Sequence, residues 1–599
     1  MTTNNSNDGV SRRTFLQGTG SVAAAAAVAG CGGRADSDPT AGTDGEGAGR
    51  GEPVPDATLN LINSTITTLD PVAATDTASG AIIENVFDGL MNYPNGVAAV
   101  ESLLATDYET SDDFTTYTFS LADAQFHNGD AVTAQDFVYS LYRLAFSDNS
   151  RRTRFILDSL GVTRPAEGEL GVRAVDDETL EIQLQEPFHA VLEMLAYSSF
   201  AAVPEGIVGD VEGYEGEMAY ETFAQSDPIG AGPYEFEDWT QGTSADITRF
   251  DDYHGGDVSN GGVHWDVIED DQAAYNHAMN RNADVFGLPT AQYDPAKVSV
   301  ERTDDRGREH GTYGDLRNGL TANYLAVPEI SVFYVGFNTA VVPKPVRQAF
   351  AYATDQHLLV DEVFKGRGEP AYHFTPPSIY PGGAEAYADH ARNAYPYGYD
   401  ESRLDMATQI MEDAGYGPDN QFRIEWTQYE SDTWRRMAQI LRDQLASAHI
   451  EMEIQQAPFS TLTERGRNGN LEAFTLGWIA DWPAPDNFLQ LLNPPQTDTS
   501  MDAPISFINW SADTGDAAGR ATDAYGTIED NPEPTDAAQQ ARERAYVEIE
   551  EANWEDVGML NIYHSLGERF WYDWVDIDPD GGMGGSRQKL DDVRIFAHE

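Results

Sequence analysis

Apolar and polar residues along this chain follow two different spacings. They alternate in 117–121 and 180–184, which predicts strands with one buried face. Apolar residues recur every three or four positions in 82–90 and 137–144, which predicts amphipathic helices. The same spacings predict further helices near 346–353, 403–414, 433–446 and 537–553, and further strands near 58–62, 450–454 and 474–478.

Capping residues indicate where some of these elements begin and end. Thr133 can cap the helix that contains 137–144, and Gly415 stands where a helix-ending glycine belongs. Strands and helices do not alternate strictly, as they do in a doubly wound sheet, and we find no internal repeat. With 599 residues, the chain also exceeds the usual size of one hydrophobic core. The pattern therefore predicts two or more α/β lobes with mixed sheets.

The chain is strongly acidic, with 100 Asp and Glu residues against 36 Lys and Arg and a formal net charge of -64. This charge excludes nucleic acid as a partner, because the phosphate backbone would repel the protein. The acids are interleaved with aromatic and aliphatic residues, and only four of the basic residues are lysine. Such a composition resembles that of proteins from extreme halophiles, in which molar salt screens the repulsion between carboxylates.

The first thirty residues have the pattern of an export signal. Arg12 and Arg13 are followed by Phe-Leu, as in a twin-arginine signal. An alanine-rich run, too short to span a membrane, leads to Val-Ala-Gly-Cys, which resembles a lipobox ending at Cys31. Cys31 is the only cysteine, which excludes disulfides within the chain and cysteine-based zinc sites.

These motifs predict the location of the protein. We expect a signal peptide over 1–30, a lipid on Cys31 and a disordered acidic, glycine-rich tether over 31–56, which lacks large apolar residues. The protein is then a lipoprotein, exported by the twin-arginine route and anchored at the outer face of the cell membrane.

Several segments resemble, in the same order, the family-5 extracellular solute-binding proteins. These are the oligopeptide-, dipeptide- and nickel-binding components of ABC importers. The most specific segment is 126–138, where Phe-His-Asn-Gly-Asp precedes Val-Thr-Ala and a helix. The other matching segments are 229–234 (Ile-Gly-Ala-Gly-Pro-Tyr), 337–353, 477–481 (Gly-Trp-Ile-Ala-Asp) and 485–489 (Pro-Asp-Asn-Phe-Leu).

The resemblance covers the chain from about residue 59 to its end. It implies a two-lobed clamshell of the type II periplasmic-binding-protein kind, with mixed sheets and an extra subdomain inserted in lobe I. Lobe closure around a peptide and delivery to the permease subunits of an importer would follow. It implies no enzymatic activity, no cofactor and a monomer. The expected boundaries are 57–98, 199–334 and 565–599 for lobe I, 99–198 for the extra subdomain, and 335–564 for lobe II.

The resemblance also implies a set of ligand-binding residues. The carboxylate that receives the peptide ammonium falls on Asp481, and the neighbouring strand contributes Trp478 and Ile479. Phe459 and Trp478 would be aromatic walls. The remaining predicted contacts are Thr75 and Thr77 in the first lobe, and Tyr563.

One position departs from the family pattern. Dipeptide binders place a carboxylate-binding arginine at a position that falls near Gln428, and no arginine lies close to it in the sequence. Longer peptides therefore remain open as ligands, and so do an oligosaccharide, a nickel complex and haem.

Two unrelated functions compete with this interpretation. A secreted hydrolase is disfavoured because the chain has no Gly-x-Ser-x-Gly, no His-Glu-x-x-His and no phosphate loop. The stretch 576–581 resembles a calcium loop, but Pro579 is awkward inside such a loop and Arg587 occupies the position of the last ligand. We therefore predict no metal site.

Overall fold

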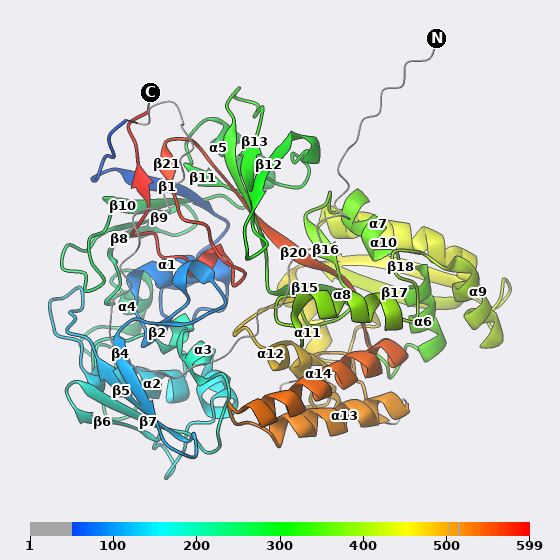
Figure 1. The fold of residues 1–599 in the computed structure, drawn as a ribbon, viewed down its shortest axis with the longest axis horizontal. Coiled ribbons are helices and arrows are strands. Elements are labelled where there is room, and N and C mark those ends of the chain that lie inside the picture. The colour runs from blue at the N-terminus through cyan, green and yellow to red at the C-terminus, as the bar shows by residue number, and fades with distance from the viewer. Residues whose placement is uncertain (1–50, 430, 502–503, 513–514, 599) are drawn as a thin grey trace. The chain divides into compact units, whose positions relative to one another are not determined.

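The computed structural model describes residues 51–599, apart from 430, 502–503, 513–514 and 599 (Figure 1). Residues 51–599 belong to one unit. Arg12, Arg13 and Cys31 lie outside the described residues. Near the start of the described range, the Val54 N–H already donates to the Ile595 carbonyl at 2.7 Å. Among the described residues, none of the helices combines the length and the apolar character that a bilayer span requires.

A four-stranded sheet contains the first strand of the chain. Its strand order is β1 (Thr58–Asn63), β10 (Gly262–Val267), β9 (Ser244–Arg249) and β8 (Tyr234–Thr240), and only the β1–β10 pair is parallel. Helix α1 (Thr77–Val86) is capped by Asp76, whose side chain accepts the Ser79 N–H. A Cβ on Gly232 would lie 2.6 Å from the backbone of Val86, so the glycine lets the 229–234 turn lie against the end of α1.

The inserted segment forms a second, antiparallel sheet. Its strand order is β4 (Ala105–Thr110), β5 (Thr116–Leu121), β7 (Thr179–Gln183) and β6 (Val172–Asp176). Helix α2 (Ala134–Phe146) covers it and buries Phe137 and Leu141 against the sheet residue Phe119. As predicted, Thr133 caps this helix, in a capping box with Asp136.

The largest sheet has ten strands, two of which branch from its main path. The path is β12 (Val298–Thr303), β13 (Glu309–Tyr313), β14 (Ala322–Pro328), β20 (Met559–Trp571), β15 (Ser331–Phe337), β19 (Ala473–Ile479), β17 (Phe422–Tyr429) and β18 (Ile450–Ala457). Strands β11 (Val285–Phe286) and β16 (Gly368–Pro370) pair with β20.

Strand β20 connects the two halves of this sheet. Its first residues pair with β15, and its last residues pair with β14 (Figure 1). At the change of partner, the hydroxyls of Ser331 and Ser565 lie 2.7 Å apart. The Ser565 hydroxyl also bonds the Glu329 carboxylate at 2.5 Å. This place in the sheet is where the chain passes between the two predicted lobes.

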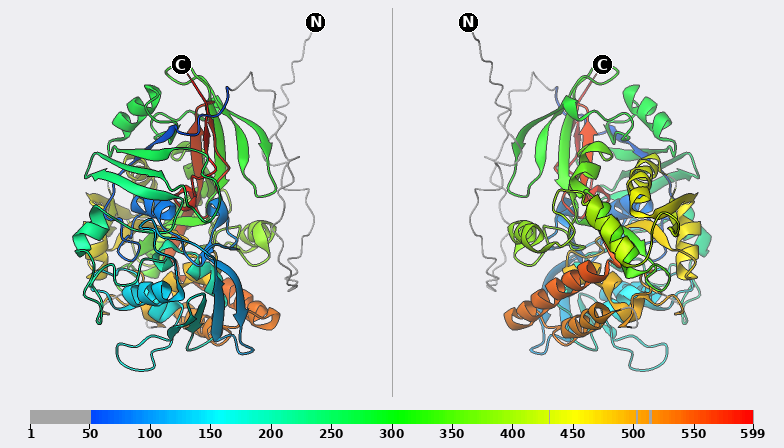
Figure 2. Two further views of the ribbon diagram at one scale, coloured as in Figure 1. Left: turned by 90° about the vertical axis from the view of Figure 1, so that its left-hand side faces the viewer. Right: turned by 90° about the vertical axis from the view of Figure 1, so that its right-hand side faces the viewer.

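Most of the larger helices follow β15 in sequence. Helices α13 (Asp516–Glu529) and α14 (Asp536–Asp556) pack against each other as a pair (Figure 2). The others in this part are α6 (Lys344–Ala353), α7 (Gln356–Glu362), α8 (Gly383–Ala394), α9 (Leu404–Asp413), α10 (Asp432–Leu445), α11 (Phe459–Arg467) and α12 (Pro485–Leu489). Short elements elsewhere are β2 (Met91–Asn92), β3 (Glu101–Ser102), α3 (Val191–Leu195), α4 (Tyr220–Gln225), α5 (Asp271–Met279), β21 (Val575–Asp576) and β22 (Arg594–Ile595).

The buried apolar side chains of the described residues form three clusters. One lies beneath the four-stranded sheet of β1, and another lies among α6, α10 and the β17–β18 pair. The third joins the inserted segment to the chain around α12, since Phe155 and Trp482 belong to the same cluster. The inserted segment therefore packs directly against the segment that follows β19.

Candidate functional site

Strand β19 has one fully paired edge and one edge that is mostly open. It pairs with β15 along its whole length, from Ala473 to Ile479. Within the described residues, its pairing with β17 stops after Phe474. The backbone from Thr475 to Ile479 thus has a free edge in the interior of a large sheet, where an extended chain can add as a further strand.

The glycine in this strand is required by packing. A Cβ on Gly477 would lie 2.5 Å from the ring of Phe333 on β15. Trp478 is half-buried, and its indole Nε1 donates to Asn487 Oδ1 at 3.0 Å. Ile479 is exposed. The same Asn487 oxygen accepts the Asp481 N–H at 3.1 Å, so Asn487 fixes the turn that follows β19.

The carboxylate of Asp481 lies just beyond the open edge, opposite two arginines. Asp481 Oδ1 is 4.0 Å from Arg152 Nη1, and Arg587 Nη2 donates to the Ala480 carbonyl at 3.2 Å. Burial raises the pKa of Asp481, and the positive charges of Arg152 and Arg587 offset this rise only in part. A further cation would therefore stabilise the ionised form of Asp481.

Arg152 also connects Asp481 to the predicted first-lobe loop. Its Nε donates to the Ala74 carbonyl at 3.3 Å, directly before the exposed Thr75. Thr77 is exposed as well, at the first position of α1. The structure thus places Thr75 on the loop that Arg152 joins to Asp481, and Thr77 at the start of the helix that follows this loop.

The two remaining predicted aromatic residues lie on other elements. Phe459 is 63% exposed at the start of α11 and makes no ring–ring contact within the described residues. Tyr563 is buried on β20, with its ring stacked on Phe333 at 4.8 Å and close to Phe364. Tyr563 therefore packs against Phe333, the ring that lies next to Gly477 of β19.

The position that departs from the dipeptide-binder pattern is occupied by an internal hydrogen-bonding residue. Gln428 is fully buried on β17. Its Oε1 accepts the Trp426 indole N–H at 3.1 Å, and its Nε2 donates to the Ser431 carbonyl at 3.4 Å. Both ends of its side-chain amide are thus used within the protein.

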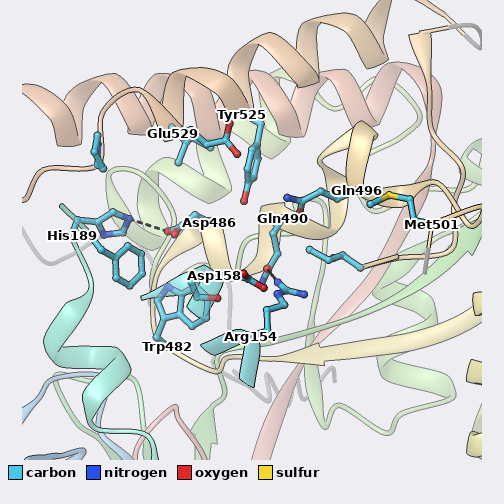
Figure 3. A pocket seen from close by; sticks show the side chains of 15 residues that line it. Arg154, Asp158, His189, Trp482, Asp486, Gln490, Gln496, Met501, Tyr525 and Glu529 are labelled. Carbon is cyan, nitrogen blue, oxygen red and sulfur yellow. Dashed lines mark hydrogen bonds and ion pairs between the residues drawn. The ribbon is translucent and has the colours of Figure 1, made fainter. Parts of the chain in front are cut away.

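Trp482, the residue after Asp481, lines a cavity of about 460 Å³ (Figure 3). Trp482 makes edge contacts with Phe155 and Phe188 of the inserted segment. His189 Nε2 lies 3.4 Å from Asp486 Oδ1. Burial opposes ionisation of Asp486, but His189, a backbone hydrogen bond and the charge of Arg542 together outweigh it, and the pKa of Asp486 is lowered. The inserted segment and the chain after β19 are therefore joined by polar as well as apolar contacts.

Sequence reasoning missed the two arginines next to Asp481. In the sequence, Arg587 is notable only because it occupies the position of the last ligand in the calcium-like stretch. In the structure that loop is held by ion pairs, because Asp580 bonds Arg569 at 2.5 Å and Asp576 lies 3.7 Å from Arg594. No grouping of His, Cys, Asp and Glu that could hold a metal ion occurs in the part of the chain that the structure describes.

Comparison with known proteins places this chain in a family. The model of the bacterial extracellular solute-binding proteins, family 5 Middle, matches residues 99–500. Oligopeptide-binding protein OppA of Bacillus subtilis is 23% identical over 480 residues, covering 77% of this chain and 83% of that protein. Glutathione-binding protein GsiB of Salmonella paratyphi A is 26% identical over 450 residues, covering 72% and 78%.

Solved structures share the fold. Haemophilus influenzae OppA in complex with RPPGFSPFR has a TM-score of 0.67 at 18% identity, and the match covers 91% of this chain and 100% of that one. AppA of Bacillus subtilis in complex with a nonapeptide has a TM-score of 0.69 at 20% identity, with the same coverage. The predicted type II periplasmic-binding-protein fold with mixed sheets is thereby confirmed. The chain belongs to the bacterial extracellular solute-binding proteins of family 5.

Proposed function

We propose that this protein is the extracellular solute-binding subunit of an ABC importer and that it captures peptides for delivery to a membrane permease. The observation that carries the proposal is the open edge of β19 between Thr475 and Ile479. A peptide backbone has the alternating donors and acceptors that such an edge needs. Pairing through the main chain leaves peptide side chains free to vary, which suits a receptor for many sequences.

The groups around this edge fit the end of a peptide. Arg152 and Arg587 offset the burial of the Asp481 carboxylate only in part, so this carboxylate suits a free ammonium group. Trp478 and Ile479 would contact the first residues of the ligand, and Thr75 and Thr77 would approach its backbone from the first lobe. Phe459 would move onto the ligand as an aromatic wall, and Tyr563 would support the ring of Phe333.

Relatives support the choice of peptides. The similar proteins are named as oligopeptide-binding and glutathione-binding, and two of the similar structures hold peptides. All of them are solute-binding proteins, which agrees with a role in binding and not in catalysis. No cofactor is required by this role.

Closure of two lobes would bury the ligand. The proposed lobe I comprises 57–98, 199–334 and 565–599, lobe II comprises 335–564, and the extra subdomain comprises 99–198. Two features support a hinge at these boundaries. Strand β20 changes its pairing partner from β15 to β14 beside Ser565, and the chain also connects β14 to β15 there. We expect the protein to act as a monomer.

The N-terminal motifs complete the proposal. Export through the twin-arginine signal at Arg12 and Arg13, followed by lipid attachment at Cys31, would hold the protein at the outer face of the membrane. The excess of acids over bases and the scarcity of lysine support a halophilic habitat.

The test has two parts. Protein purified in molar salt is denatured, and the released ligand is identified by mass spectrometry; peptides are the expected result. Calorimetry then compares a bound peptide with copies that are N-methylated at single backbone nitrogens. Methylation at the residues that add to β19 should weaken binding at least tenfold, because each removes a main-chain donor. Release of a non-peptide solute, or indifference to every methyl group, would refute peptide capture on this edge.

A further inference from the structure

Among the described residues, no carboxylate lies at ion-pair distance from Arg587, although the chain is rich in carboxylates. Its guanidinium lies 4.5 Å from the ring centroid of Tyr197 and 5.4 Å from that of Tyr93. Its Nη2 donates to the Ala480 carbonyl at 3.2 Å and lies 3.5 Å from the Asp481 carbonyl. None of the carboxylates in the described residues lies within 4.0 Å of this guanidinium, although Asp and Glu outnumber Lys and Arg by 100 to 36.

Glu84 is a second acid close enough to feel the charge of Arg587, but it is a poor counterion. Glu84 is buried, and burial raises its pKa despite the opposing effects of Lys589 and Arg587. Lys589 itself is paired with Asp88 at 2.7 Å. Glu84 therefore offers Arg587 a weakened negative charge at a distance, and no hydrogen-bonded carboxylate.

Arg152 is held in a similar way. Its Nη2 donates to the Tyr197 hydroxyl at 2.9 Å and its Nε donates to the Ala74 carbonyl at 3.3 Å. Its charge lies over the ring of Phe155. Within the described residues, Asp481 is the only carboxylate at ion-pair distance, and that distance of 4.0 Å is too long for a hydrogen bond.

A ligand ammonium on Asp481 would change the charge balance of this group. The single negative charge of Asp481 lies 4.0 Å from Arg152 and also feels the positive charge of Arg587, so one carboxylate is shared by two cations. If the ammonium occupied the carboxylate, two partly buried guanidinium groups would lose the counterion they share. Their positions are fixed by aromatic rings and carbonyl oxygens, so they cannot easily turn toward water. A second negative charge close to Asp481 would restore the balance.

We propose that Arg152 and Arg587 bind a carboxylate of the ligand, and that the preferred ligands carry an ammonium and a carboxylate on the same first residue. This inference rests on the proposed peptide-binding function and names the class of peptide. Because Arg152 lies only 4.0 Å from Asp481, the two ligand charges must be close together. An amino-terminal Glu or Asp has this arrangement, and so does a γ-linked glutamyl residue. An ordinary neutral first residue does not.

Short-range recognition of this kind is compatible with the charge of the whole protein. A net charge of -64 repels anions at long range, but at molar salt the Debye length is about 3 Å. Only contacts at hydrogen-bond distance then discriminate between ligands. Two fixed guanidinium groups supply such contacts for a carboxylate.

The test uses matched ligands on the full-length mature protein in molar salt. Calorimetry compares Glu-Ala-Ala with Gln-Ala-Ala, which have nearly the same shape and differ in one charge, and adds γ-glutamyl-alanine. The wild type should bind the two carboxylate ligands at least tenfold more tightly than Gln-Ala-Ala. Arg587→Gln and Arg152→Gln should each reduce this preference, measured within the same variant, to threefold or less. The control Arg173→Gln removes an exposed arginine that pairs with Glu181 on β7, and it should keep the full preference.

The outcomes separate this inference from the function on which it rests. Equal binding of Glu-Ala-Ala and Gln-Ala-Ala by the wild type overturns the carboxylate site and leaves peptide capture intact. A preference that survives in both arginine variants also overturns it. Failure of every peptide to bind overturns peptide capture itself, and this inference with it. The wild-type comparison is decisive even if a variant does not fold.

Discussion

The guanidinium group of Arg143 on α2 and the carboxylate of Asp70 form a bidentate ion pair that is completely buried, with N–O distances of 3.2 and 2.9 Å. Asp210 bonds the same guanidinium from another side at 2.9 Å. Asp70 lies directly before the loop that contains Thr75. The pair therefore joins the inserted segment to the loop that approaches the proposed ligand.

Removing one member of this group should destabilise the protein strongly. Arg143→Met leaves two carboxylates in the interior without their cation, and the loss should be about 3–5 kcal/mol. Urea unfolding in molar salt, followed by circular dichroism, measures the shift in midpoint. Arg173→Met is the matched control, because Arg173 is largely exposed in its pair with Glu181, and it should leave the midpoint unchanged. Equal shifts in the two variants would contradict a structural role for the Asp70–Arg143 pair.

Glu550 should make stability depend on pH. It is buried on α14, and its two oxygens accept the N–H groups of Phe374 and Thr375, each at 2.8 Å. Burial raises the pKa of Glu550 to about 7, although these hydrogen bonds oppose the rise. The folded chain therefore holds a proton that the unfolded chain releases near pH 4.5. This contribution to stability, about 3 kcal/mol, is complete below pH 4.5 and is lost as the pH rises to about 7.

A neutral variant isolates this effect from other titrations. Asp210 has a pKa that is lowered, since Arg143 and the hydrogen bonds from Ser147 and Asn149 together outweigh burial, so it acts in the opposite direction at lower pH. Urea midpoints of the wild type and of Glu550→Gln should be compared at each pH between 5 and 8. The wild type should lose stability relative to the variant as pH rises. Parallel curves would mean that Glu550 ionises at its ordinary pKa.

Local sequence signals were enough to predict much of the fold. The capping box of Thr133 and Asp136 and the left-handed Gly415, with φ of 88°, act within a few residues, so the sequence shows them directly. The strand predicted at 474–478 is β19 with one residue added at each end. The open edge of β19 could not be predicted, because it depends on where β17, some fifty residues away, stops pairing.

The same limit applies to the candidate site. Asp481 could be selected from the Gly-Trp-Ile-Ala-Asp segment by resemblance. Its neighbours Arg152 and Arg587 are separated from it by more than a hundred residues in the chain, so no local pattern marks them. Tyr563 was predicted as a ligand contact, but its stacking on Phe333 depends on the register between β15 and β20, which the sequence does not reveal.

Salt should control cooperativity of folding. Lowering the salt from molar to 0.1 M lengthens the Debye length from about 3 Å to about 10 Å. Repulsion within a chain of net charge -64 then extends over several neighbouring carboxylates. Thermal unfolding by circular dichroism should become broader and shift to lower temperature after dialysis. An unchanged transition in 0.1 M salt would contradict the interpretation of the acidic composition as an adaptation to salt.

Cell fractionation tests the export signal and the anchor. Cys31→Ser removes the proposed site of lipid attachment and should move the protein from the membrane fraction to the medium. Replacing Arg12 and Arg13 together by lysine should retain the precursor inside the cell. A lysine pair keeps the charge, so retention would report recognition of the arginines themselves. Wild-type fractionation of both variants would rule out this route and this anchor.

Asp481 should dominate recognition of the peptide amino terminus. Its carboxylate is largely buried and only partly compensated by the arginines, so a ligand ammonium would complete a charge-assisted pair. Truncating one partner of such a pair leaves the other charge buried, at a cost of roughly 2–5 kcal/mol, or about thirtyfold or more in affinity. Calorimetry in molar salt should therefore show that Asp481→Ala binds peptides at least thirtyfold more weakly than the wild type.

Two comparisons make this last test specific. The control Asp573→Ala removes an exposed acid beyond the end of β20 and should leave affinity unchanged. N-acetylation removes the ammonium from the ligand side, so it should weaken binding to the wild type as much as Asp481→Ala does. Acetylation should have little further effect on the Asp481→Ala variant, because the two changes remove the same interaction. If each change alters affinity by less than threefold, Asp481 does not receive an ammonium, and an uncharged solute such as an oligosaccharide becomes the better ligand for this site.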